Sequence, residues 1–167
     1  MTTTVGTTAV RERSPRAAPR WASTAGTLIA AAGAAVAGYL TYAHYHGATV
    51  LACPDRGIVD CATVTTSSYS VIAGVPVAVI GLAYFVVMVV LELPWNWRLP
   101  RPVWRRLRVA ASAAGAAVAI WLIYVELFRL DAICLYCTAV HSLALALFAV
   151  TALGAAWTDE DDDPATP

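Results

Sequence analysis

The stretch AICLYCTAVHSLALALFAVTALGAAWT, residues 132–158, contains no Asp, Glu, Lys or Arg. It is as long as the roughly 17 to 25 apolar residues with which a helix crosses a lipid bilayer. It also lacks the alternation of about ten-residue strands that marks a membrane β-barrel, so its backbone must be satisfied within a helix. The stretch therefore predicts a membrane helix that begins with a C-x-x-C pair.

Three further runs without charged residues precede it, at residues 21–54, 61–91 and 109–125. The chain is 59% hydrophobic and 13% charged, with a mean hydropathy of +0.65, whereas soluble domains are about a quarter charged. We expect an all-α integral membrane protein, a four-helix bundle with spans near 24–45, 72–92, 108–127 and 133–156. The first uncharged run is too long for a cleaved signal peptide, so we interpret it as an uncleaved helix.

The basic residues indicate the orientation. All eleven are arginine, and only Arg56 and Arg129 lie outside two groups. The two groups are Arg11, Arg13, Arg16 and Arg20, before the first span, and Arg98, Arg101, Arg105, Arg106 and Arg108, between the second and third spans. The positive-inside rule places both termini and the 94–107 loop in the cytoplasm. We see no pattern typical of nucleic-acid binding. We expect segment 1–20 and the acidic tail 158–167 to be disordered and cytoplasmic, flanking a membrane domain at 21–157.

The four cysteines all fall on the outer side of this topology. Cys53 and Cys61 flank the loop CPDRGIVDC, and Cys134 and Cys137 open the fourth span. That side is oxidising, so disulfides can persist, and four cysteines allow three pairings between which the sequence does not choose. Two inert disulfides are one interpretation. A zinc site is another, although the C-x7-C spacing and the oxidising side disfavour it.

A redox interpretation rests on the fourth span. Cys134, Cys137 and His141 are spaced i, i+3 and i+7, which places them on one helix face. The positive end of a helix dipole favours thiolates, which carry out thiol–disulfide exchange, although Asp131, an expected N-cap, would oppose this. Two pairs on one membrane face can form a two-stage relay. The sequence has no flavin, haem or nucleotide motif, so we expect a lipid-soluble quinone to accept electrons at Cys137.

Several of these residues together resemble the bacterial vitamin K epoxide reductase (VKOR) family. The motifs are the two cysteines of C-x7-C, Ser67 six residues later, YSVIAGVPVAVIG at 69–81, YVELF at 124–128 and C-x-x-C. The resemblance covers residues 22–155 and implies a four-helix bundle around a quinone pocket, with an outer loop and a short helix between spans 1 and 2. It further implies a multi-pass protein of the bacterial inner or plasma membrane that uses menaquinone or ubiquinone and no metal. The substrate would be a separate thioredoxin-fold, DsbA-like dithiol carrier, because this chain has no fused thioredoxin domain.

The resemblance also assigns roles to the cysteines. Cys53 would take electrons from the partner dithiol. Cys61 would pass them through a mixed disulfide to Cys134. This step would release Cys137 as the thiolate that faces the quinone.

Two further residues are expected at the quinone. Ser67 would steady the active loop and the pocket, or serve only as a cap or turn hydroxyl. His141 would donate a hydrogen bond or a proton to the quinone, or bond a neighbouring carbonyl. Val77 aligns with an asparagine of the vertebrate enzyme and cannot make its hydrogen bond, so epoxide reduction is doubtful as the natural reaction.

A rival interpretation is a small four-helix transporter or scaffold whose cysteines only staple its outer face. Glu126 would then be the proton-coupling residue, although pairing with Arg129 at i+3 explains it more simply. We also expect Trp95, Trp97 and Trp104 to anchor the cytoplasmic interface. Ala111, Gly115 and Ala119 form a small-residue row that allows close helix packing.

Overall fold

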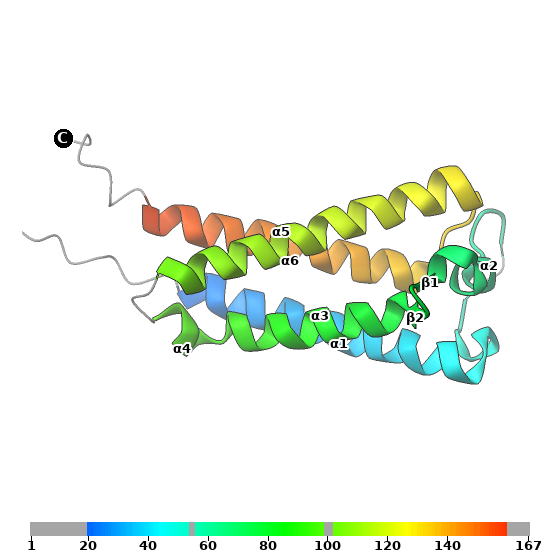
Figure 1. The fold of residues 1–167 in the computed structure, drawn as a ribbon, viewed down its shortest axis with the longest axis horizontal. Helices are drawn as coiled ribbons and strands as arrows, with labels where there is room; N and C mark the ends of the chain where they lie inside the picture. The colour runs from blue at the N-terminus through cyan, green and yellow to red at the C-terminus, as the bar shows by residue number, and fades with distance from the viewer. Residues whose placement is uncertain (1–19, 54–55, 99–101, 160–167) are drawn as a thin grey trace, which may run out of the picture.

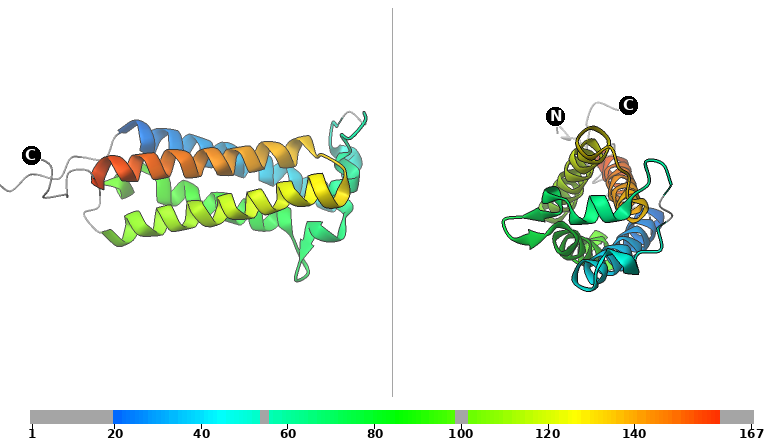
Figure 2. Two further views of the ribbon diagram at one scale, coloured as in Figure 1. Left: turned by 90° about the horizontal axis from the view of Figure 1, so that it is seen from above. Right: turned by 90° about the vertical axis from the view of Figure 1, so that its right-hand side faces the viewer.

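The computed structural model describes residues 20–53, 56–98 and 102–159. In this part of the chain, four long helices lie side by side as an elongated bundle: α1 (Arg20–His46), α3 (Val77–Glu92), α5 (Pro102–Val125) and α6 (Leu135–Asp159) (Figures 1 and 2). The most extensive helix contacts are α1 with α3, α1 with α6, and α5 with α6. Most of segments 1–20 and 158–167, for which we expected disorder, lies outside the described residues.

Short elements close the two ends of the bundle. One end carries the short helix α4 (Pro94–Trp97) together with Arg20 and the end of α6 (Figure 1). The opposite end carries the remaining elements: η1 (Ala48–Val50), α2 (Cys61–Thr66), η2 (Ser68–Ser70), the strands β1 (Val71–Ile72) and β2 (Val75–Pro76), and the π-helical segment η3 (Glu126–Leu130). We call this second end the cysteine end, because all four cysteines lie there or at the adjoining start of α6.

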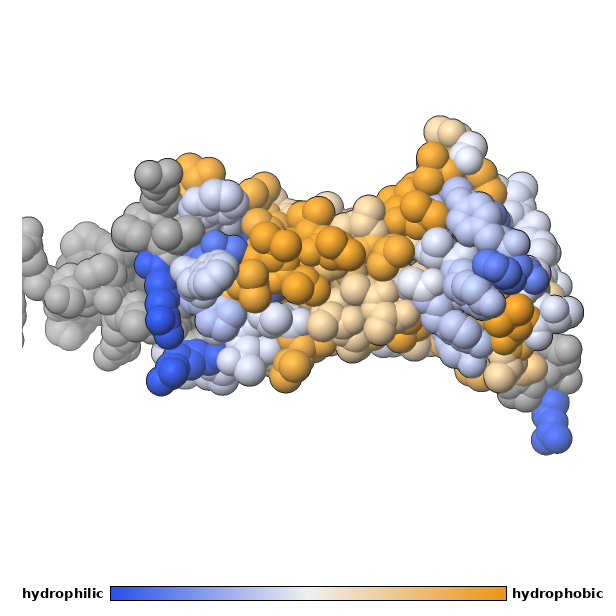
Figure 3. All heavy atoms as spheres, turned by 90° about the horizontal axis from the view of Figure 1, so that it is seen from below, coloured by the Kyte–Doolittle hydropathy of each residue, from blue (hydrophilic) through white to orange (hydrophobic). Residues whose placement is uncertain are grey.

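The chain is an all-α membrane protein apart from this small hairpin. Among the described residues, three helical stretches are long and apolar enough to cross a bilayer: Arg20–His46, Pro102–Leu130 and Leu135–Trp157. The fourth, α3, is apolar but has only 16 residues, which is about 24 Å of helix against a hydrocarbon core of about 30 Å. Figure 3 shows one face of the molecule, with apolar residues across its middle and hydrophilic residues toward both ends.

The second span was predicted to begin at residue 72, and this boundary is wrong. Ala73 (φ 51°) and Gly74 (φ 82°) turn the chain, so that Val71 pairs with Pro76 and Ile72 with Val75 in an antiparallel hairpin. Only glycine enters this backbone region without steric cost, which makes Gly74 a natural turn residue. The helix starts after Pro76, because proline is accepted at a helix N-terminus but not within one.

Small residues let the helices approach closely, as predicted for the third span. A methyl group added at Gly115 of α5 would overlap the Tyr84 ring of α3, and one added at Gly33 of α1 would overlap the Phe85 ring. Phe85 lies with Met88 and Leu147 in the central apolar core. Since lipid is as apolar as these side chains, close van der Waals packing rather than exclusion of water holds such helices together.

A buried polar cluster ties the bundle together at the α4 end. The Glu92 carboxylate is fully buried and accepts hydrogen bonds from Trp97 Nε1 (3.0 Å) and Thr151 Oγ1 (2.9 Å). The buried Arg108 guanidinium lies 4.1 Å from the centre of the Trp97 ring. The prediction that Trp97 is an interfacial anchor is therefore wrong, since its side chain is buried and bonded to Glu92. Trp95 is 71% exposed and remains available for that role.

Candidate active site

The first cysteine pair forms a disulfide at the cysteine end. Cys53 and Cys61 are bonded, with their Cα atoms 6.2 Å apart. Asp60 is the N-cap of α2: its Oδ1 accepts the Thr63 amide (2.9 Å) and its Oδ2 accepts the Thr63 hydroxyl (2.6 Å). These hydrogen bonds with Thr63 lower the pKa of the exposed Asp60 carboxyl. They also fix Cys61 as the first residue of α2.

Backbone hydrogen bonds join this loop to the segment before α6. The Asp60 amide donates to the Ile133 carbonyl (3.1 Å), and the Ile133 amide donates to the Ile58 carbonyl (2.8 Å). The next residues along the two segments are Cys61 and Cys134. Both of these are fully buried and belong to one apolar cluster.

The second cysteine pair consists of free thiols. The Cys137 amide donates to Cys134 Sγ (3.2 Å) across the first turn of the helix. Cys53 and Cys137 are only half-buried, and both pack against the cluster that contains Cys61 and Cys134. The structure therefore brings all four predicted cysteines together: two of them lie inside the cluster and two at its edge.

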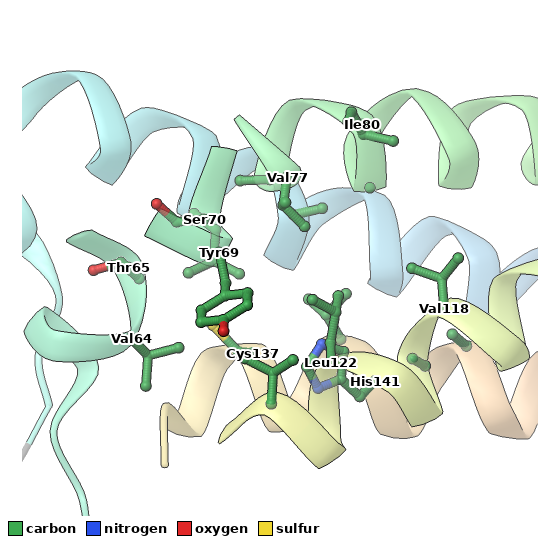
Figure 4. Close-up of a pocket in the computed structure, with 18 of the residues that line it drawn as sticks. Val64, Thr65, Tyr69, Ser70, Val77, Ile80, Val118, Leu122, Cys137 and His141 are labelled. Carbon is green, nitrogen blue, oxygen red and sulfur yellow. The ribbon is translucent and has the colours of Figure 1, made fainter. Parts of the chain in front are cut away.

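A cavity of about 300 Å³ lies beside this cluster, between α1, α2, α3, α5 and α6 (Figure 4). Its wall is mostly apolar, with Val77 and Ile80 from α3 opposite Val118 and Leu122 from α5. The polar and ionisable groups of its wall are His44, Thr65, Ser67, Tyr69, Ser70, Tyr84, Glu126, Cys137 and His141. Three of the six predicted site residues therefore line the cavity, namely Ser67, Cys137 and His141, and the other three lie in the adjoining cluster.

His141 lies on the cavity wall one helical turn beyond Cys137. The residue is 6% exposed and its Nδ1 has no hydrogen-bond partner. The nearest charged group is Glu126, whose Oε1 lies 3.8 Å from that nitrogen. The expected alternative, a hydrogen bond from the imidazole Nδ1 to a neighbouring carbonyl, is not made in the described structure.

Glu126 has different neighbours from those expected. Its carboxylate accepts the backbone amide of Cys134 (3.4 Å) and faces His141. The expected ion pair with Arg129 is not formed among the described residues, because η3 winds as a π-helix that turns Glu126 inward and leaves Arg129 exposed. The N-cap prediction for Asp131 is also wrong. This residue is left-handed (φ 47°) and ends η3, with its amide bonded to the Glu126 carbonyl.

Ser67 lies at the edge of the cavity and makes the hydrogen bond of a cap hydroxyl. The residue lines the cavity, yet its hydroxyl donates to the Val64 carbonyl (2.9 Å), as a cap hydroxyl does. Its carbonyl in turn accepts the amide and hydroxyl of Ser70. Ser67 thus links α2 to η2 at the cavity edge.

Tyr84 is a cavity residue that sequence reasoning missed. Its hydroxyl is buried without a hydrogen-bond partner, and the ring lies against Gly115. Tyr84 lies seven residues after Val77, which is two helical turns along the same face of α3. That spacing is the signal that could have identified it.

A comparison with protein families agrees with this geometry. The sequence model described as "Vitamin K epoxide reductase family" matches residues 24–152. This range includes all of the cysteine end, the cavity and most of the bundle. The chain belongs to the vitamin K epoxide reductase family, a family of oxidoreductases.

Proposed function

We propose that this protein is a membrane thiol:quinone oxidoreductase that reoxidises an extracytoplasmic thioredoxin-fold carrier and so supports disulfide formation. The observation that carries the proposal is the position of Cys137. Its thiol packs against the cluster of the other three cysteines and also lines the cavity with His141. One residue therefore joins a set of exchangeable sulfurs to a site for a small molecule.

The cavity suits a quinone. Ligand sites of this kind are mostly apolar with a few polar groups that fix orientation. Two polar groups on its wall, the Tyr84 hydroxyl and the His141 imidazole, can hydrogen-bond carbonyl oxygens, and the Tyr84 hydroxyl is buried without a hydrogen-bond partner in the described structure. A bound quinone, either menaquinone or ubiquinone, would supply the electron sink, taking up two electrons and two protons to become a quinol.

The cysteines would act in the following order. A thiolate of the carrier attacks Cys53, the half-buried member of the outer disulfide, and frees the Cys61 thiol. Cys61 then attacks Cys134 of an oxidised Cys134–Cys137 pair, which frees Cys137 beside the cavity. The second carrier thiol displaces Cys53 as the carrier disulfide forms, and the freed Cys53 attacks Cys61, which restores the outer disulfide and releases Cys134 as a thiol. In the described structure the outer pair is a disulfide and the inner pair is two thiols. This is the redox state in which the inner pair holds the electrons.

The proposal includes the orientation and the span count. We infer that α3 completes four spans, with both termini in the cytoplasm and the cysteine end outside the bacterial inner or plasma membrane. The hairpin at residues 71–76 supports a membrane span at the short α3, because it continues the chain from the start of α3 toward the cysteine end. The carrier would be a separate DsbA-like protein that meets the loop at Cys53.

A scaffold whose cysteines only staple the outer face fits less well. Cys134 and Cys137 are free thiols, so they form no staple in this structure. Transport through Glu126 has no supporting observation, since this carboxylate faces His141 and the Cys134 amide at one end of the bundle.

The test combines purified protein with a reduced thioredoxin-fold carrier and a quinone. We expect catalytic loss of quinone absorbance together with one carrier disulfide formed per quinone reduced. Wild-type protein that binds carrier and quinone but transfers no electrons would reject the proposal and favour the scaffold. Menaquinone and ubiquinone analogues compared in the same assay would identify the natural acceptor.

A further inference from the structure

Glu126 and His141 form an isolated pair at the cavity wall. Both residues are nearly fully buried, come from adjacent elements, η3 and α6, and line the cavity next to Cys137. The approach of Oε1 to Nδ1, at 3.8 Å, is longer than a hydrogen bond. Such contacts are often long in ligand-free catalytic sites and shorten when the substrate binds.

A buried carboxyl group and a buried imidazole next to each other call for an explanation, because an unpartnered polar group in an apolar site costs free energy. The Glu126 carboxylate has one partial partner, the Cys134 amide at 3.4 Å. His141 Nδ1 has no hydrogen-bond partner. Two apolar side chains would pack equally well at these positions. The ionisable pair therefore points to a role in the proposed reaction rather than in packing.

The chemistry of the proposed reaction creates a need for such a pair. Oxidation of Cys134 and Cys137 forms one S–S bond and releases two electrons and two protons, and conversion of a quinone to a quinol takes up the same numbers. The reaction is therefore balanced without an outside acid. However, the protons must travel from sulfur to oxygen inside a mostly apolar cavity.

We propose that Glu126 and His141 are the proton carrier of this site, an inference that rests on the proposed function. His141 Nε2 takes the proton from the Cys137 thiol and passes it to a quinone oxygen. Glu126 orients the ring and stabilises the transient imidazolium through Nδ1, as a carboxylate does in other carboxylate–histidine pairs. The pair carries the two protons one after the other and ends each turnover in its starting state.

Few other ionisable groups could take this role. Those that face the cavity among the described residues are His44 from α1, Tyr69 from η2, Tyr84 from α3 and Cys137 from α6. The thiol of Cys134 adjoins Glu126 and interacts with it electrostatically. In the same turn as Glu126, the nearby charged residues Arg129 and Asp131 are exposed.

The kinetic test uses protein pre-reduced at Cys134 and Cys137. We expect Glu126→Gln to slow quinone reduction roughly 10- to 100-fold near neutral pH. Added imidazole, a small diffusible proton carrier, should restore part of the lost rate of quinone reduction. A purely structural role of Glu126 predicts no rescue by imidazole. The matched control is Glu92→Gln, which places the same amide in an equally buried position at the other end of the bundle and should reduce quinone at the wild-type rate.

A double variant tests whether the two residues act as a unit. If Glu126 and His141 act as a unit, the double variant Glu126→Gln/His141→Gln should reduce quinone no more slowly than the slower of the two single variants. The effects of coupled residues are not additive. Multiplied losses would show two independent roles and overturn the pair. Exchange between Cys61 and Cys134, measured separately in each variant, separates failure of the proton carrier from failure of the relay: we expect quinone reduction to fall much further than exchange does.

A readout without quinone completes the test. Nitrogen NMR of ¹⁵N-histidine-labelled protein distinguishes the two imidazole tautomers. In the wild type we expect His141 to carry its proton on Nδ1, toward Glu126, and Glu126→Gln should redistribute it between the two nitrogens. The other histidines of the chain, His44 and His46, are internal controls that should not change. A His141 signal identical in wild type and variant would overturn the inference, even if wild-type protein reduces quinone normally.

Discussion

The amide of Asp60 donates a hydrogen bond to the carbonyl of Ile133 at 3.1 Å, which ties the residue before Cys61 to the residue before Cys134. The loop between the first two spans and the start of the last one are thereby held in register. Since thiol–disulfide exchange requires direct contact between sulfurs, this tie supports the proposed exchange between Cys61 and Cys134. The tie itself is made by backbone atoms alone.

The first prediction concerns the order of transfer. Cys61→Ala and Cys134→Ala should each abolish oxidation of the protein carrier, because each removes one side of the exchange. Cys53→Ala should do the same, yet a small membrane-permeant dithiol should still reduce the Cys134–Cys137 pair. Carrier oxidation and dithiol oxidation are measured in parallel by thiol titration. Equal losses with both donors in Cys53→Ala would contradict the assigned order.

The second prediction concerns Cys137. Cys137→Ala should accumulate a disulfide between Cys61 and Cys134, formed when the Cys134 thiolate attacks Cys61 of the outer disulfide and frees Cys53, since no Cys137 thiol remains to resolve it from the cavity side. Non-reducing peptide mapping by mass spectrometry would detect the bond, and stopped-flow absorbance should show no quinol formation. Ser67→Ala is the control, because its hydroxyl bonds the Val64 carbonyl and should alter the rate by less than tenfold. Normal quinol formation without Cys137 would remove it from the electron path.

The helical bundle and the family could be predicted from the sequence, because both are indicated by patterns that extend over many residues. Uncharged runs of helical length mark the spans, and the cysteine spacing together with YVELF marks the family. Local backbone events were harder to predict. The turn at Ala73 and Gly74 lies inside an apolar run, and apolar residues alone do not distinguish an exposed hairpin from the first turn of a helix.

The site was predicted only in part, for a related reason. A C-x-x-C-x3-H spacing places three side chains on one helix face, and the structure has Cys137 and His141 on the cavity wall. Glu126 was recognised as unusual but given the wrong neighbour, because i+3 spacing assumes an α-helix and η3 is a π-helix. Tyr84 was missed although its spacing from Val77 places both on one face of α3, and Trp97 was misjudged because its partner Glu92 lies in another helix.

The third prediction tests the orientation. A reporter fused after Asp163 should be cytoplasmic, and one inserted at Gly57 should be outside. The arginines of the described residues at the α4 end, Arg20, Arg98, Arg105, Arg106 and Arg108, lie opposite the cysteines. Paired alkaline phosphatase and fluorescent-protein fusions report the two sides. A C-terminus outside the membrane would place the cysteines in a reducing cytosol and remove the basis of the relay.

The fourth prediction concerns close packing of α1 on α3. Gly33→Leu should destabilise the bundle by about 1–3 kcal/mol or more, since even its Cβ overlaps the buried Phe85 ring. Gly38→Ala on the same helix is the control: its Cβ would lie 3.8 Å from Leu82, an ordinary contact, and the change should be neutral or mildly stabilising. Thermal unfolding in detergent measures both. Equal stability of the Gly33 and Gly38 variants would contradict the packing.

The fifth prediction concerns the buried Glu92. Its carboxylate accepts hydrogen bonds from Trp97 and Thr151. It is also the nearby negative charge that interacts with the buried Arg108 guanidinium. Glu92→Ala should therefore cost about 3–5 kcal/mol of stability, the range seen when one partner of a buried charged pair is removed. Glu92→Gln keeps hydrogen-bonding capacity and should cost clearly less.

Chemical denaturation in mixed micelles, followed by tryptophan fluorescence, measures both Glu92 variants and reports on Trp97 itself. Glu92→Ala should lose more stability than Glu92→Gln, and this difference should largely disappear when Arg108 is also changed to Met. The buried guanidinium that Glu92→Ala leaves unpaired is then absent. Glu92→Ala that is as stable as wild type would mean that water reaches the cluster and replaces the carboxylate. In that case the α4 end would be an open, hydrated face of the bundle.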